Sequence, residues 1–160
     1  MKTILAKMNN LIIHRGPDED GFFTEANDSF SLGMAMRRLS IIDLASGKQP
    51  IFSDDKQIVI VFNGEIYNYR ELKSELIEKG ATFKTTSDTE VILKLYELEG
   101  TASFKKLDGM FAFSIYDKNT NKLYIARDFF GEKPLYYTAM QNRFIWASEL
   151  KSIVNLETVN

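Results

Sequence analysis

The 160-residue sequence contains no cysteine and only one histidine, His14. Without cysteine the chain forms no disulfide, and it offers neither a Cys-His catalytic pair nor the ligands of a zinc finger. We therefore expect no metal site. For His14, a hydrogen-bonding role at the end of a helix is favoured over a role as general base, because no cysteine or serine partner is evident.

A strong excess of charge of one sign and a long apolar run are also missing. The net charge is −2 with a pI near 5.5, which gives no basic surface for a nucleic acid. The apolar runs are far shorter than the roughly 20 residues of a membrane-spanning helix, and no secretory signal opens the chain. We expect a cytoplasmic protein with neither nucleic acid nor membrane as a partner. Its 44% hydrophobic composition suits one domain over residues 1–160.

The most informative stretch is an apolar run, residues 58–62, followed directly by Asn63 and Gly64. Five consecutive β-branched or aromatic residues predict a strand buried on both faces. Asn-Gly after such a strand has two interpretations. It is the strongest short signal for a hairpin turn, which these residues alone favour. Alternatively, the Asn63 side-chain amide and the Gly64 backbone N–H stabilise a developing oxyanion, as preorganised donors do in active sites.

The remaining patterns predict a mixed fold. Apolar spacing indicates helices at residues 1–13, 69–79 and 88–98, with Leu72, Leu76 and Ile77 buried on the second and a capping box at residues 87–90. Strands are expected at residues 22–24, 31–36 and 51–52, followed by a four-stranded meander at 110–117, 123–127, 135–139 and 143–147. The fold class is therefore α+β, with two layers of sheet between helices.

The adjacent arginines Arg37 and Arg38, and the acidic residue Asp88, are candidates for binding a charged group. Arg37 and Arg38 are adjacent on a predicted strand, so one should face solvent and the other should face inward, where it needs an anion. Asp88 stands at the start of a predicted helix. From its spacing alone, compensation of the helix dipole is a better explanation of Asp88 than contact with a ligand.

Five motifs in order along the chain resemble those of one family. They are His14-Arg15-Gly16-Pro17-Asp18, Arg38-Leu39-Ser40-Ile41, Asn63-Gly64-Glu65-Ile66-Tyr67-Asn68, Ser87-Asp88-Thr89-Glu90 and Asp128-Phe129-Phe130-Gly131-Glu132-Lys133-Pro134-Leu135-Tyr136. Over about residues 8–154 the sequence resembles the glutaminase domain of glutamine-dependent asparagine synthetases, which are class II glutamine amidotransferases. The resemblance implies a four-layer αββα sandwich of the N-terminal nucleophile hydrolase type, with residues 1–160 as one partial domain.

The resemblance also implies a reaction. In that family an N-terminal cysteine thiolate attacks the side-chain amide of glutamine, forms a thioester and releases ammonia, with the free α-amine (pKa about 7.7 to 8.0) as base. A second, ATP-using domain then amidates aspartate. Here position 1 is methionine, and neither the cysteine-initiated strand nor the synthetase domain is found. We expect an N-terminally truncated chain, through a gene-start choice, an engineered boundary or degeneration, that has no glutaminase activity by itself.

By the same resemblance Arg38 binds the α-carboxylate of glutamine and Asp88 its α-ammonium. Asn63 and Gly64 form the oxyanion hole, and backbone groups of Leu39, Ser40, Ile41, Ile42 and Glu65 complete the pocket. No cofactor is expected in this domain, because ATP and magnesium belong to the synthetase domain.

The expected partners are L-glutamine and a synthetase domain or subunit, and an exposed sheet edge also favours a homodimer. The alternative is a non-catalytic glutamine sensor or an assembly module for a partner synthetase. The acceptor substrate stays open, since relatives amidate molecules other than aspartate.

Overall fold

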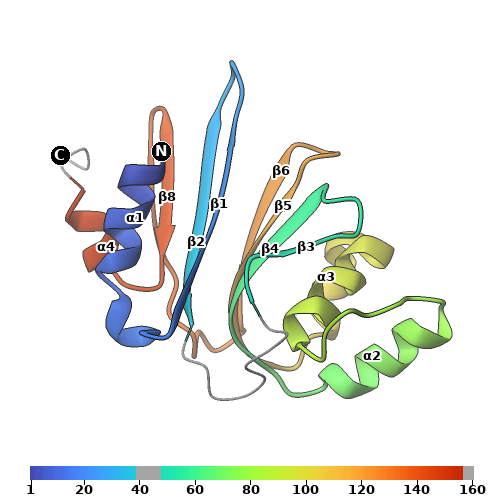
Figure 1. Ribbon diagram of the computed structural model, residues 1–160. Coiled ribbons are helices and arrows are strands. Elements are labelled where there is room, and N and C mark those ends of the chain that lie inside the picture. Colours follow the sequence, from blue (N-terminus) through green and yellow to red (C-terminus); the bar gives the residue numbers. More distant parts are fainter. Residues whose placement is uncertain (39–47, 157–160) are drawn as a thin grey trace.

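The computed structural model describes residues 1–38 and 48–156, and these form two layers of sheet between two layers of helices (Figure 1). The helices are α1 (Lys2–Asn10), α2 (Tyr69–Glu78), α3 (Asp88–Glu99) and α4 (Lys151–Val154), with 3₁₀ turns η1 (Ile13–Arg15) and η2 (Gly100–Lys106). The strands are β1 (Glu19–Ala26), β2 (Ser31–Arg38), β3 (Ile51–Phe52), β4 (Ile58–Ile66), β5 (Gly109–Asp117), β6 (Lys122–Arg127), β7 (Tyr136–Met140) and β8 (Arg143–Ala147).

Strand β4 lies inside a four-stranded antiparallel sheet with the order β3-β4-β5-β6. Its residues Ile58–Phe62 are all buried, as the sequence predicts. Ile58, Ile60 and Phe62 pack toward α2 and α3, whereas Val59 and Val61 pack toward the other sheet layer. The two sides of the strand thus hold both apolar cores of the domain together.

The other sheet layer consists of two separate antiparallel pairs, β1-β2 and β7-β8. Helices α1 and α4 lie outside this layer, and α2 and α3 lie outside the four-stranded sheet (Figure 1). The Trp146 Nε1–H of β8 donates to Ser114 Oγ of β5 at 2.7 Å and so joins the layers. This is the α+β arrangement expected from the sequence.

The expected four-stranded meander is wrong. Strands β5 and β6 belong to the four-stranded sheet, while β7 and β8 form a hairpin in the other layer. The segment between β6 and β7 is longer than the roughly two to five residues of a hairpin loop, so it carries the chain from one layer to the other. Asp128 fixes this crossing, because its carboxylate accepts hydrogen bonds from the backbone N–H groups of Glu132 and Lys133 at 2.8 and 3.0 Å.

Three local expectations also need correction. The first helix ends at Asn10, and a separate 3₁₀ turn follows it. Ile77, expected in the core, is 54% exposed. At the start of α3, Ser87 Oγ accepts from Thr89 N–H as a cap should, but Glu90 accepts from Lys84 and Thr85 N–H groups of the preceding loop. No helix in the described part of the chain is long and apolar enough to cross a membrane.

Candidate active site

Asn63 and Gly64 do not form a hairpin turn. They lie within β4, where Asn63 is opposite Ala112 and Gly64 opposite Phe111 of β5. The turn interpretation is wrong because β4 stays paired with β5 as far as Ile66, which overrides the local turn signal. The strand, expected to end at residue 62, therefore ends four residues later, at Ile66.

Gly64 is required by the close approach of β5. Its φ is +155°, and a Cβ at this position would lie 2.1 Å from the Met110 carbonyl oxygen. Such a contact is with backbone, so a flexible side chain cannot move aside to relieve it.

We expect Gly64→Ala to lower the free energy of unfolding by about 3 kcal/mol, since it forces β4 away from β5. Gly80→Ala is the control, because Gly80 also has a positive φ of 91° but nothing within 4 Å of an added Cβ. The free energy of unfolding of that variant should fall by only about 1 kcal/mol. Urea denaturation measures both values, and equal losses would show that the contact with Met110 is unimportant.

The side chain of Asn63 faces the space between the two sheet layers, because Val59 and Val61 on the same side of β4 pack there. Its Nδ2 atom is buried and has no hydrogen-bond partner among the described residues. A buried donor without an acceptor costs about 1 to 3 kcal/mol. Such a donor is available to an oxygen atom of a bound molecule.

The edge of β4 that faces β3 has an unusual pattern of partners. Strand β3 pairs with Val59 and Ile60, and no other strand among residues 1–38 and 48–156 pairs with this edge. Side chains take the place of a strand there, with Gln49 bonded to Phe62 and Asp88 to Ile66. Gly64 belongs to the same alternating row, and its N–H makes no hydrogen bond within residues 1–38 and 48–156. Asn63 and Gly64 thus each have one hydrogen-bond donor without a partner among the described residues.

Arg38, at the end of β2, faces the same space between the sheets as Met34 and Met36 on its strand. Its side chain is 12% exposed and donates to Glu19 Oε2 at 3.2 Å. Glu19 lies directly opposite on β1 and was not foreseen from the sequence. The inward arginine therefore has an anion, as expected, and that anion comes from the protein itself.

The first of the five motifs holds the backbone of Arg38. Gly16 lies so close that a Cβ there would be 2.4 Å from Arg38 N. Pro17 forms an isolated β-bridge with Arg38, and Asp18 N–H donates to the Arg38 carbonyl at 3.3 Å. Residues 16–18 therefore fix the position of the Arg38 backbone, from which the guanidinium side chain extends.

Arg37 does not face solvent, which corrects the expectation for the second arginine. Its side chain is only 9% exposed. It donates to the Asn9 carbonyl at 3.2 Å and to Asn10 Oδ1 at 2.5 Å, and so ties β2 to the outer helix α1. Arg37 is buried by a helix layer that the strand pattern alone does not reveal.

Asp88 is the first residue of α3, and its Oδ2 accepts from Ile66 N–H at 3.0 Å. Burial raises the pKa of this carboxyl, although the N–H groups of Ile66 and Thr89 partly oppose the rise. The helix-dipole interpretation is therefore incomplete, since Asp88 also holds the end of β4. A carboxylate destabilised by burial would gain from a cationic group placed beside it.

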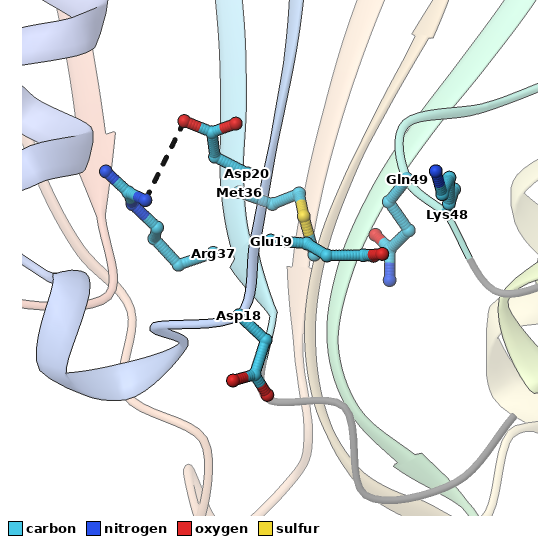
Figure 2. Close-up of a pocket in the computed structure, with 7 residues that line it drawn as sticks. All are labelled: Asp18, Glu19, Asp20, Met36, Arg37, Lys48 and Gln49. Carbon is cyan, nitrogen blue, oxygen red and sulfur yellow. Dashed lines mark ion pairs between the residues drawn. The ribbon is translucent and has the colours of Figure 1, made fainter. Parts of the chain in front are cut away.

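A cavity of about 380 Å³ lies between the start of β1, the end of β2 and the segment before β3. In Figure 2 the Glu19 side chain extends toward Gln49, whereas Asp20 turns away to pair with Arg37. Neither Arg38, Asn63 nor Asp88 lines the cavity; its wall consists of Asp18, Glu19, Asp20, Met36, Arg37, Lys48 and Gln49. Leu39, Ser40, Ile41 and Ile42, expected in the pocket, lie outside the described residues.

Comparison with known proteins assigns the family. The model of the glutamine amidotransferase domain matches residues 1–160. The chain belongs to the glutamine amidotransferase family. Similar members include asparagine synthetase [glutamine-hydrolyzing] 1 of Bacillus subtilis, 50% identical over 153 residues, with 96% of this chain and 24% of that protein covered. The asparagine synthetase [glutamine-hydrolyzing] of Sandersonia aurantiaca is 41% identical over 148 residues, covering 92% of this chain and 27% of that protein.

This amidotransferase domain thus spans about a quarter of the length of those two relatives. Its fold is also that of glutamine phosphoribosylpyrophosphate amidotransferase from B. subtilis, with a TM-score of 0.78 at 21% identity over 95% of this chain and 40% of that one. The likeness confirms the four-layer αββα sandwich of the N-terminal nucleophile hydrolase type. In the described part of the chain no cluster of three acidic or histidine side chains could hold a metal ion.

Proposed function

We propose that this domain binds L-glutamine and forms the ammonia-releasing part of a cytoplasmic, glutamine-hydrolysing asparagine synthetase. The observation that carries the proposal is a pair of donors, Asn63 Nδ2 and Gly64 N–H, that lack a partner among the described residues and lie on successive, half-buried residues of the paired strand β4. An amide carbonyl under nucleophilic attack becomes an oxyanion. Fixed donors in a site shielded from water stabilise that charge without reorganising.

Glutamine is a zwitterion, and the two charged candidates suit its two ends. Arg38 presents a planar guanidinium that can grip a carboxylate with two parallel hydrogen bonds, and Glu19 already fixes one side of that guanidinium. Asp88, half-buried at the start of α3, presents its carboxylate to the α-ammonium. Backbone groups of Glu65 and of residues 39–42 complete the proposed pocket.

The chemistry we assign to this pocket is acyl transfer. A cysteine thiolate attacks the side-chain amide carbon of glutamine, Asn63 and Gly64 stabilise the tetrahedral oxyanion, ammonia leaves, and water hydrolyses the thioester to glutamate. The thiolate is not among these 160 residues. In the proposed whole protein, ammonia passes to a synthetase domain or subunit, where ATP and magnesium serve the amidation of aspartate.

Titration of the 160-residue chain with L-glutamine in a calorimeter tests the recognition step. We expect Arg38→Ala and Asp88→Ala each to weaken glutamine binding by about ten- to a hundredfold, because each removes a charge-assisted hydrogen bond worth roughly 1.5 to 3 kcal/mol. The glutamine affinity of Arg38→Lys should lie between those of the parent and Arg38→Ala, since lysine keeps the charge but not the planar guanidinium.

Two variants control for charge and folding. Arg70→Ala removes an exposed arginine from α2, and Asp28→Ala removes an exposed aspartate from the β1-β2 turn. Both should bind glutamine as the parent does, and circular dichroism shows whether each variant is folded. Unchanged affinity in folded Arg38→Ala and Asp88→Ala would contradict the assignment of these two residues.

A further inference from the structure

Gln49 makes a double contact with the residue that precedes Asn63. Its Oε1 accepts from Phe62 N–H at 2.7 Å, and its Nε2 donates to the Phe62 carbonyl at 3.1 Å. A side-chain amide carries the same donor and acceptor as a peptide group, so Gln49 gives Phe62 the two hydrogen bonds that a neighbouring strand would give. Without Gln49, the backbone N–H and C=O of the buried Phe62 would both lack a partner among the described residues.

Gln49 is itself held from both sides, through its backbone on one side and its side chain on the other. On one side its backbone lies against β1, where a Cβ on Gly21 would be 1.9 Å from the Gln49 carbonyl oxygen. On the other side its Nε2 also lies 3.5 Å from Thr89 Oγ1 on α3. The amide that grips Phe62 is thus fixed to both sheet layers, rather than to a mobile surface loop.

Gln49 and Asp88 bracket the two unused donors on one edge of β4. Gln49 fixes Phe62, immediately before Asn63, and Asp88 fixes Ile66, two residues after Gly64. On the opposite edge β5 pairs with the whole of this segment. The backbone from Phe62 to Ile66 is therefore constrained on both sides, so the direction of the Gly64 N–H and the backbone position from which the Asn63 side chain extends are set before any ligand arrives.

We propose that Gln49 is a positioning residue for the oxyanion donors Asn63 and Gly64. This inference rests on the proposed glutaminase function and adds a residue that acts through the backbone of Phe62 without touching glutamine. Oxyanion stabilisation depends on donors held within a few tenths of an ångström, and a misplacement of about 1 Å costs roughly a hundredfold in rate. Loosening the Phe62 peptide should therefore lower turnover more than it lowers glutamine affinity.

The kinetic test uses a version of the protein that begins with a cysteine-initiated strand. Gln49→Met keeps the length of the side chain but removes both hydrogen bonds. We expect its kcat for glutaminase to fall at least about tenfold, while the KM for glutamine stays within about twofold. The control is Gln57→Met, because Gln57 Nε2 donates to the Asp55 carbonyl at 3.2 Å, just before the same strand. That variant should keep the parent kcat.

Gln49→Glu separates the two hydrogen bonds. Its carboxylate can still accept from Phe62 N–H but has no proton for the Phe62 carbonyl, so its kcat should lie between those of the parent and Gln49→Met. A loss of thermal stability with kcat per folded molecule unchanged in Gln49→Met would mean that Gln49 is only structural, and would overturn the inference.

A second measurement uses the 160-residue chain as it stands. In ¹⁵N NMR spectra, the Asn63 side-chain amide and the Gly64 N–H should shift in Gln49→Met and stay in place in Gln57→Met. Signals of Asn63 and Gly64 that do not move in Gln49→Met would overturn the inference even if the protein binds glutamine normally. If the parent chain itself binds no glutamine, the proposed function is overturned, and the positioning role falls with it.

Discussion

Asn63→Ala should lower glutaminase turnover by about a hundred- to a thousandfold in a version of the protein that carries the N-terminal cysteine, with the KM for glutamine nearly unchanged. The donor acts on charge that appears only in the transition state, so its loss affects kcat and not ground-state binding. The structure supports this because Asn63 Nδ2 is buried and makes no hydrogen bond within residues 1–38 and 48–156.

The stability of the same variant distinguishes this role from a structural one. Since Asn63 Nδ2 has no partner in the described chain, Asn63→Ala should not destabilise the fold, and removal of an unpaired buried donor favours stability. Asn68→Ala is the matched control. Asn68 bonds the Lys106 carbonyl at 2.8 Å and Asp108 N–H at 3.1 Å, so its loss should lower the melting temperature and leave turnover per folded molecule intact. The opposite pattern would make Asn63 structural.

The parts of the fold that the sequence predicts are those set by local composition. The apolar run 58–62 forms the buried first part of β4, and Gly80 and Ser87 mark the end of α2 and the start of α3. In each case neighbouring residues carry the signal, either as a run of β-branched side chains or as a helix cap. Tertiary packing reinforces these preferences and does not oppose them.

The parts that the sequence mispredicts depend on distant partners. Asn63-Gly64 is a strong local turn signal, but Ala112 and Phe111 pair with it from another part of the chain. Similarly, the sequence pattern predicts that β7 and β8 continue the sheet of β5 and β6. They lie in the other layer instead, where Trp146 bonds Ser114 across the layers. No pattern within a few residues contains this information, because long-range packing decides it.

The same reasoning explains the candidate site. Arg38 and Asp88 follow from the motifs, whereas Glu19 and Gln49 were missed. Gln49 bonds Phe62, which is 13 positions away in the sequence, and Glu19 bonds Arg38, which is 19 positions away. Neither residue stands in a local sequence pattern that predicts its partner. Glu19 would have been found if the first strand had been extended to pair fully with the second, because its register places Glu19 opposite Arg38. The side chains that support a site are harder to predict than those that touch the ligand.

Glutaminase activity should be absent from the 160-residue chain itself. The proposed mechanism needs a thiolate beside an α-amine, and the chain has methionine at position 1 and no cysteine anywhere. His14 is no substitute base, because of where it lies: its Nε2 pairs with Glu149 Oε1 at 2.7 Å and its Nδ1 lies 3.5 Å from Lys151 Nζ. Those contacts tie η1 to the residues at the start of α4, which lies outside the β1-β2 and β7-β8 layer (Figure 1), whereas Asn63 belongs to β4 in the four-stranded sheet.

An ammonia-release assay compares the chain with a version preceded by a cysteine-initiated strand and with the same version carrying serine in place of that cysteine. The chain and the serine version should release ammonia at the background rate, because a nucleophile acting with its base accounts for about a millionfold in kcat in related hydrolytic chemistry. The cysteine version should turn over glutamine. If it binds glutamine but never releases ammonia, the domain is a glutamine sensor. Turnover by the unextended chain that Asn63→Ala abolishes would contradict the mechanism and require a nucleophile among its serines and threonines.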